Sequence, residues 1–152
     1  MTKILFVCHG NICRSPMAEF IMKRLVSEAG LKKEFIVASA AVSREENGNP
    51  VYPPAKRILW EHGISCGGKT AVQMTKGDYG KYDHIICMDR TNVRGALRIL
   101  RSDPANKVSR LLDFTDSPRD VADPWYSGDF VTAYKDIDEG CRALLEHILF
   151  IS

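Results

Sequence analysis

Apolar and polar residues follow one another along the chain in blocks that are typical of strands followed by helices. The unbroken apolar run Ile4-Leu5-Phe6-Val7 predicts a first strand that is buried on both faces. Apolar residues then recur at helical spacing from Met17 to Val26, and Gly30 is a favourable stop for that helix. Ser15-Pro16 favours a helix start at this point, because serine is a good cap and proline a good first helical residue.

The same alternation continues toward the C-terminus. It predicts three more strands, at Phe35–Ser39, His84–Met88 and Val108–Leu112. Pro54 can open a second helix, Asp89 can cap a helix that runs to Leu100, and Asp129 can cap the last helix. Because strands alternate with helices, we expect a three-layer α/β fold with a four-stranded parallel sheet and helices on both faces. A length of 152 residues suits a single domain, 1–152.

The loop between the first strand and its helix has the residues of an anion site. Backbone N–H groups and the positive end of the helix dipole converge there. Arg14 can hold two phosphate oxygens, and Gly10 and Asn11 tolerate the left-handed backbone that a tight loop needs. Cys8 ends the strand in this positive environment, which favours the nucleophilic thiolate. The pattern predicts attack on phosphorus and a phosphocysteine intermediate. Ser15 would either cap the helix or donate a hydrogen bond to the Cys8 sulfur.

Cleavage of a phosphate ester also needs an acid that protonates the departing oxygen. The connection from Asp113 to Asp129 is predicted to have little regular structure, and long loops often carry function. Asp123 is the favoured acid of this loop, because Pro124 stiffens the backbone beside it. Trp125 and Tyr126 follow and could flank a flat ring. Taken alone, Asp-Pro would be interpreted as a simple turn.

The motif Cys-x-Gly-Asn-Ile-Cys-Arg-Ser-Pro-x-Ala-Glu, which starts at Cys8, resembles the signature of the low-molecular-weight protein-tyrosine phosphatases. Asp123-Pro-Trp-Tyr is similar to the general-acid motif of that family. The resemblance implies a flavodoxin-like fold with strand order 2-1-3-4 and metal-independent hydrolysis of phosphotyrosine through Cys8, Arg14 and Asp123. The residues that it implies for phosphate binding are Cys8, His9, Gly10, Asn11, Ile12, Cys13 and Arg14.

The resemblance also implies supporting roles around this centre. Ser15, Ser39 and Asp89 would stand behind the phosphate loop, although Ser39 and Asp89 have the alternative of being turn or cap residues. Ile12, Trp125 and Tyr126 would form the substrate mouth. Cys13 would form a reversible disulfide with Cys8 that protects it from over-oxidation, with an inert loop residue as the equal alternative.

Some positions depart from the family pattern. His9 stands where a leucine or threonine is usual, and a cation there would favour the thiolate further. The aromatic wall expected after Ser39 is missing from segment 40–54 unless Tyr52 replaces it. These changes leave the predicted catalytic residues in place, but they put the specificity for particular phosphopeptides in doubt.

Composition and charge exclude several classes of binding partner. The net charge is +2 and basic residues do not interleave with aromatic ones, so we expect no nucleic-acid partner. We expect no membrane span and no signal peptide, because no apolar run is long enough and the first strand starts at once. Five cysteines without a Cys-x2-Cys pair fit neither a disulfide framework nor a zinc site, and they suit a reducing cytoplasm. We expect a monomer without cofactor that takes phosphotyrosine proteins and binds inorganic phosphate or other oxyanions.

Three rival functions have specific residues against them. Arsenate reduction on the same scaffold needs relay cysteines; Cys87 is present, but Arg94 stands where a partner is needed. Protein-arginine phosphatases resemble this chain but carry threonine where Ile12 stands and lack the aromatic pair after the acid. A phosphotyrosine-binding module without activity would not need Cys8, Arg14 and Asp123 together.

Overall fold

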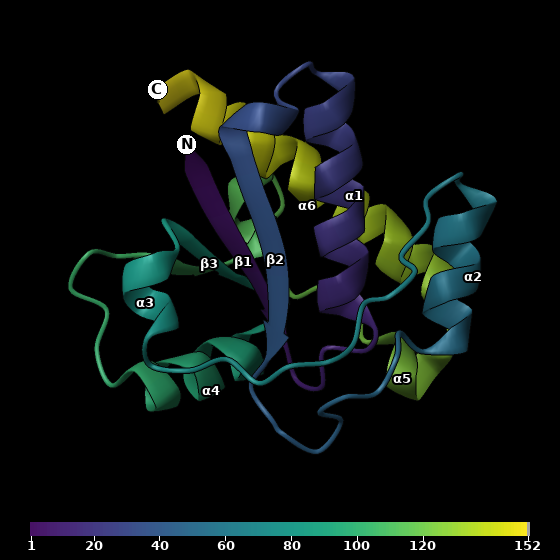
Figure 1. Cartoon of the computed structure of the whole chain (residues 1–152), viewed down its shortest axis with the longest axis horizontal. Helices are drawn as coiled ribbons and strands as arrows, with labels where there is room; N and C mark the ends of the chain where they lie inside the picture. Colours follow the sequence, from purple (N-terminus) through teal and green to yellow (C-terminus); the bar gives the residue numbers. More distant parts are fainter. Residues whose placement is uncertain (152) are drawn as a thin grey trace.

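A four-stranded parallel sheet forms the centre of the molecule (Figure 1). The computed structural model describes residues 1–151. The strands are β1 (Thr2–Cys8), β2 (Phe35–Ala41), β3 (His84–Cys87) and β4 (Val108–Arg110), in the order β2-β1-β3-β4. Cys8 pairs with Ala41, and Val7 pairs with both Ala40 and Cys87. The predicted sheet and its strand order are confirmed.

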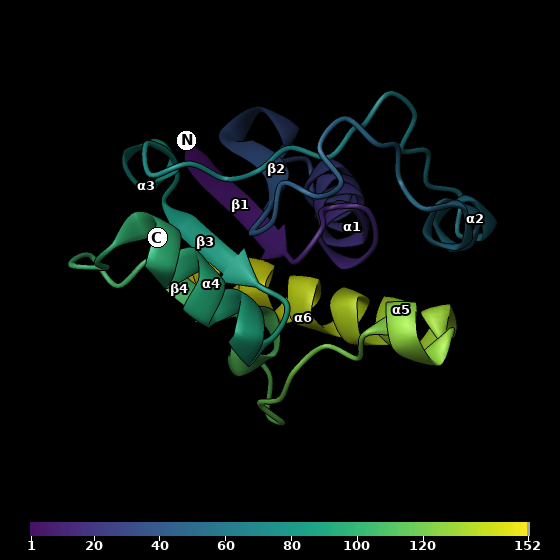
Figure 2. The same ribbon diagram turned by 90° about the horizontal axis from the view of Figure 1, so that it is seen from below.

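Helices cover both faces of this sheet (Figures 1 and 2). On one side lie α1 (Arg14–Glu28) and α6 (Phe130–Ile151), with α2 (Pro53–Glu61) packed against both. On the other side lie α3 (Asp78–Lys81) and α4 (Arg90–Leu100). Alternate side chains of β1 point to opposite faces of the sheet. Ile4 and Phe6 pack in the core under α1 and α6, whereas Leu5 and Val7 pack in the core under α4. This explains why β1 is apolar without a break.

The chain departs from the predicted elements at three boundaries. Helix α1 begins at Arg14 with Cys13 at its cap position and no side-chain cap, so Ser15 is not the cap. Strand β4 ends at Arg110, and the apolar pair Leu111-Leu112 lies in a 3-10 turn, Leu111–Phe114, where both side chains are fully buried. A short apolar run does not by itself distinguish a strand from a buried turn.

The predicted long connection contains a one-turn helix, α5 (Pro124–Ser127). Asp89 caps α4 as predicted, accepting a hydrogen bond from the Asn92 amide.

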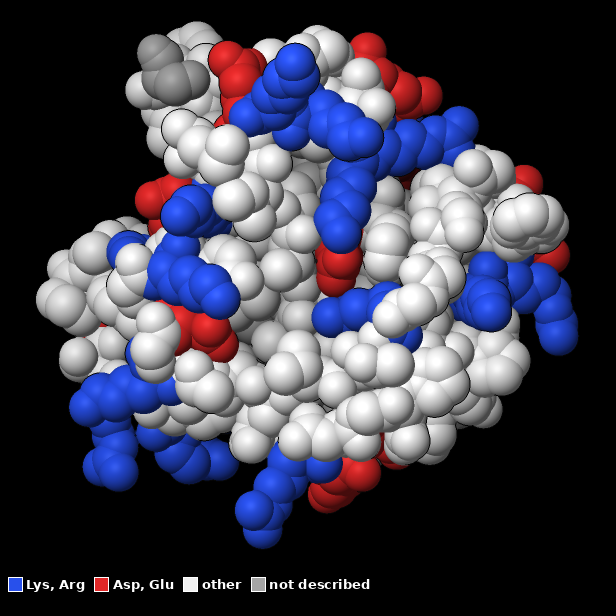
Figure 3. Space-filling model, in the orientation of Figure 1, with Lys and Arg blue, Asp and Glu red and all other residues white. Residues whose placement is uncertain are grey.

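Charged side chains are dispersed over the surface. On the face seen in Figure 3, lysines and arginines form separate groups with acidic residues between them. The arginines of α4 at positions 90, 94 and 98 are exposed, as is Arg101 just beyond it. Within residues 1–151, no helix is long and apolar enough to cross a bilayer.

The contact between α6 and the turn after β4 generates a stability prediction. A Cβ atom at Gly140 would lie 2.4 Å from Leu111 Cγ, which is an overlap in a fully buried position. We expect Gly140→Ala to lower the free energy of unfolding by about 1–3 kcal/mol in urea titrations. Gly80→Ala in α3 is the matched control, because a Cβ there meets no atom within 4 Å, and we expect it to leave the free energy of unfolding unchanged or raise it by up to about 1 kcal/mol. Equal unfolding midpoints for the two variants would contradict this packing.

Candidate active site

The loop from Cys8 to Arg14 lies at the carboxyl end of β1, in the middle of the sheet. The chain passes from β1 to β2 on one side and later to β3 on the other, so this edge is the topological switch point at which α/β folds bind ligands. Asn11 has a φ of 59°, in the left-handed region that a tight loop requires and that asparagine tolerates. Its backbone N–H donates to the Cys8 sulfur at 3.3 Å.

The side chain of Asn11 fixes the loop from inside. Its Nδ2 donates to Ser15 Oγ at 2.8 Å and to Ser39 Oγ at 2.9 Å, and its Oδ1 accepts from the Val72 amide at 3.2 Å. Asn11, Ser15 and Ser39 are all buried. These contacts tie the loop to α1, to β2 and to the segment that follows α2, so the left-handed residue is held by three parts of the chain.

The buried carboxylate of Glu19 determines which atom donates in the hydrogen bond between Asn11 and Ser39. Glu19 accepts from Ser39 Oγ at 2.6 Å, and it is paired with Lys23 at 2.6 Å and with Lys69 at 3.6 Å. A carboxylate only accepts, so the Ser39 hydroxyl gives its hydrogen to Glu19 and receives one from Asn11.

The same logic applies to Ser15, which also receives a hydrogen from Asn11. Its own hydrogen is then free for the Cys8 sulfur, which lies 2.9 Å from Ser15 Oγ. The competing contact with the Ala40 carbonyl is longer, at 3.5 Å. Ser15 Oγ thus lies at hydrogen-bond distance from the Cys8 sulfur and can donate to it when the sulfur is a thiolate, which is the geometry that the second of its two predicted roles needs.

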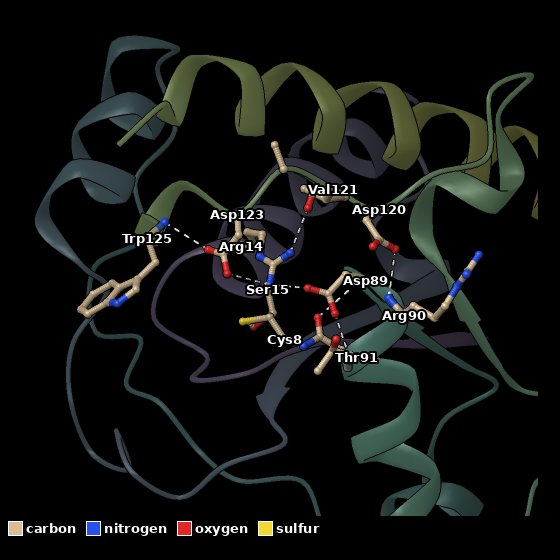
Figure 4. A network of polar contacts seen from close by, with 12 residues as sticks. Cys8, Arg14, Ser15, Asp89, Arg90, Thr91, Asp120, Val121, Asp123 and Trp125 are labelled. Carbon is tan, nitrogen blue, oxygen red and sulfur yellow. Dashed lines mark hydrogen bonds and ion pairs between the residues drawn. The ribbon is translucent and has the colours of Figure 1, made fainter. Parts of the chain in front are cut away.

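Arg14 is oriented by groups from distant parts of the chain (Figure 4). Its guanidinium is almost fully buried; Nη1 donates to the Val121 carbonyl at 3.0 Å, and Nη2 lies 2.9 Å from Asp89 Oδ2 and 3.5 Å from Asp123 Oδ2. Asp89 thus uses one oxygen to cap α4 and the other to hold Arg14. Capping α4 and contacting Arg14 are thus compatible for Asp89, and its role in the site stays a prediction.

Asp123 is placed by a connection that is itself well anchored. The Val121 amide donates to the Met88 carbonyl at 2.9 Å, and the Ala122 amide donates to Asp136 of α6 at 3.2 Å. Asp123 Oδ1 accepts from the Trp125 amide at 3.1 Å, which caps α5 and leaves Oδ2 directed at Arg14. The Asp123 side chain remains one-third exposed.

The loop, Asp123 and the aromatic residues enclose a pocket of about 230 Å³. Trp125 is half-exposed and Tyr126 largely exposed. The Tyr52 ring lies 4.9 Å from that of Trp125, centroid to centroid, with the ring planes tilted by 53°, and Tyr52 is not among the residues that line the pocket. The residues that line the pocket are Cys8, His9, Gly10, Ile12, Cys13, Arg14, Glu45, Glu46, Asp123, Trp125 and Tyr126.

Cys13 lines the same pocket, and its surroundings disfavour the thiolate form of its side chain. Burial, together with the charges of Cys8 and Asp123, raises the pKa of Cys13 to about 12. Burial also raises the pKa of Cys66, Cys87 and Cys141. All five cysteines are free thiols. Within residues 1–151, no three His, Cys, Asp or Glu side chains converge in a way that could hold a metal ion.

Sequence and structure comparisons place this geometry among known proteins. The sequence profile described as low molecular weight phosphotyrosine protein phosphatase matches residues 3–149. This chain belongs to that family. It is therefore a protein-tyrosine phosphatase by membership, a phosphoric monoester hydrolase.

Three relatives show how far the likeness extends. The low molecular weight protein-tyrosine-phosphatase YfkJ of Bacillus subtilis is 39% identical over 151 residues, covering 97% of this chain and 96% of YfkJ. Its crystal structure matches with a TM-score of 0.95 over 100% of this chain and 97% of that one. The human low molecular weight phosphotyrosine protein phosphatase is 38% identical over 94% of this chain and 93% of its own length. A Drosophila arginine phosphatase matches with a TM-score of 0.87 at 29% identity, covering 97% and 98% of the two chains.

Three contributors to this arrangement were not predicted from the sequence. Glu19 could have been recognised, because it lies one helical turn after Ser15 and so on the same side of α1. Lys69 is joined to it only by the fold. The Val121 carbonyl is a backbone group, for which the sequence holds no signal.

The raised thiol pKa values generate a labelling prediction. In Cys8→Ser, burial and the charge of Asp123 still raise the pKa of Cys13, so its ionised fraction at pH 7 falls below the roughly 3% of an ordinary cysteine. We therefore expect Cys8→Ser protein to resist iodoacetamide at neutral pH and to incorporate four labels only after it is unfolded, as measured by mass spectrometry. Labelling of folded Cys8→Ser at Cys13, at the rate of an exposed thiol, would contradict the environment described for Cys13.

Proposed function

We propose that the protein hydrolyses phosphotyrosine through a phosphocysteine intermediate, without a metal ion. The observation that carries the proposal is the convergence of the Cys8 sulfur, the Arg14 guanidinium and the Asp123 carboxylate in one pocket. Asp123 lies 109 positions after Arg14 in the sequence, and each of the three groups has the chemical type that one part of the reaction needs. Family membership and the relatives named as protein-tyrosine phosphatases support the same activity.

In the first step, the Cys8 thiolate attacks phosphorus in line with the tyrosyl oxygen. A sulfur–phosphorus bond forms and the phosphorus–oxygen bond breaks. Arg14 and the backbone amides of residues 9–14 stabilise the charge on the equatorial oxygens. Asp123, in its protonated form, gives its proton to the departing phenolate.

In the second step, water attacks the phosphocysteine and inorganic phosphate is released. Asp123, now a carboxylate, accepts the proton of the attacking water. Cys8 leaves as a thiolate, and the Ser15 hydroxyl at 2.9 Å donates a hydrogen bond to the sulfur as its charge returns. Asn11 Nδ2, which donates to Ser15 Oγ at 2.8 Å, holds that hydroxyl beside Cys8.

Metal independence follows in this proposal from the charge that the chain itself supplies. Phosphoryl transfer needs positive charge around the equatorial oxygens, and Arg14 with the loop amides provides it. The helix dipole of α1 adds to it, because the loop leads directly into its N-terminus. Inorganic phosphate and other oxyanions are expected as product or inhibitors at the same place.

An aryl phosphate is the substrate class that the pocket suits best. Ile12 and Trp125 supply apolar surface beside the phosphate loop, and Tyr126 is exposed at the rim. We propose a cytoplasmic location, since the five free thiols suit a reducing compartment. A single-domain monomer remains our expectation from the length of the chain.

Redox sensitivity is part of the proposal. A peroxide would oxidise Cys8 to a sulfenic acid, and the Cys13 thiol would condense with it to a disulfide with release of water. The raised pKa of Cys13 slows this closing step, because the thiolate is the attacking form.

The direct test is hydrolysis of para-nitrophenyl phosphate in the presence of a chelator by wild type, Cys8→Ser and Asp123→Asn. We expect turnover by wild type, none by Cys8→Ser, and a loss of about 10²–10⁴-fold in kcat for Asp123→Asn. The loss should be larger with phenyl phosphate, since phenolate is the poorer leaving group. Turnover by folded Cys8→Ser, or activity that requires added metal, would refute the mechanism. Faster hydrolysis of phosphoarginine than of phosphotyrosine would refute the substrate class.

A further inference from the structure

Besides Asp123, two carboxylates line the pocket outside the phosphate loop. Glu45 and Glu46 follow β2 and share the pocket with Cys8 and Arg14. Of the described residues in this lining, Arg14 is the only lysine or arginine, and it is 3% exposed and already paired with Asp89. The rim of the pocket therefore carries two carboxylates that no lysine or arginine of the lining neutralises.

Contacts keep both carboxylates beside the phosphate loop. Glu46 Cγ lies 3.3 Å from the position of a Cβ at Gly10, so its aliphatic part rests on the loop. Its Oε2 accepts from Asn49 Nδ2 at 2.6 Å. Glu45 Oε2 lies 3.7 Å from His9 Nε2.

The backbone of this rim is also held. The Glu45 amide donates to Ser43 Oγ, and the Gly48 amide donates to the Ala71 carbonyl at 2.9 Å. These bonds fix the backbone of the rim beside the phosphate loop, while the Glu45 side chain stays largely exposed.

A phosphotyrosine that reaches Cys8 places its phosphate inside and its neighbouring residues at the rim. We infer that Glu45 and Glu46 make the enzyme select phosphotyrosine that is flanked by lysine or arginine and disfavour phosphotyrosine flanked by acidic residues. This inference rests on the proposed function and adds the charge of the substrate segment to it. Because both side chains are near the surface, the preference should be moderate and should weaken with salt.

The test compares three phosphotyrosine peptides that differ only in the two residues on each side, which are lysine, alanine or glutamate. The measured quantity is the ratio of kcat/KM for the lysine peptide to that for the glutamate peptide, which cancels any general loss of activity in a variant. For wild type at low salt we expect a ratio of about 5–50. It should fall toward one in about 1 M salt, where screening acts over about 3 Å.

Charge variants locate the effect. Glu45→Gln with Glu46→Gln should bring the ratio close to one, and Glu45→Lys with Glu46→Lys should invert it. Glu34→Gln with Glu146→Gln changes the net charge equally at exposed positions outside the pocket, and should keep the wild-type ratio. This pair is the matched control.

Two results would overturn the inference. One is a wild-type ratio near one while the alanine peptide is hydrolysed. That result would support the proposed phosphatase activity and reject charge selection by Glu45 and Glu46. The other is a preference that persists unchanged in the doubly neutralised Glu45 and Glu46 variant. Failure of wild type to hydrolyse the alanine peptide would instead reject the proposed function, and the inference with it.

Discussion

The hydrogen bonds of Asn11 are the constraint on which the site depends. A loop can direct its amides at one anion only if its backbone takes the left-handed turn at this residue, where φ is 59°. Three side-chain hydrogen bonds hold the turn, and they join the loop to Ser15 of α1, Ser39 of β2 and the amide of Val72. Glu19 then sets the direction of these bonds, because it can only accept. Burial is what gives the arrangement its strength, since an unpaired polar group there would cost about 1–3 kcal/mol.

A second group of contacts brings the far half of the chain to the same place. Asp89 closes the start of α4 and holds Arg14, while the carbonyl of Val121 holds the other side of the guanidinium. Asp123 follows two residues later and is directed back at Arg14. The proposed acid is therefore connected through Arg14 to the start of α4. Errors in packing at either β3 or the connection before α6 would be transmitted to the pocket.

Local patterns in the sequence predicted the parallel sheet, and the family resemblance implied its strand order. Glu45 and Glu46, which line the pocket, were not among the predicted site residues. Ile4 to Val7 marked a strand by composition, and the motif from Cys8 to Glu19 marked the loop. The role of Ser15 was left open, because it depends on Asn11 and Ser39, which only the fold brings together. Leu111-Leu112 was wrongly predicted as strand, since its burial comes from the contact with Gly140 on α6. The support of Arg14 by a backbone carbonyl had no signal in the side-chain sequence.

The central claim is that phosphate passes through Cys8, and the Ser15 hydroxyl provides the means to observe it. Without the donor at 2.9 Å, the sulfur is a poorer leaving group and the second step slows more than the first. The measurement is mass spectrometry of acid-quenched Ser15→Ala protein during turnover of a phosphotyrosine peptide. The account predicts one phosphoryl group on the fragment that contains Cys8, which disappears when substrate is exhausted. Turnover at steady state with Cys8 unmodified, or with the phosphoryl group on another residue, would contradict it.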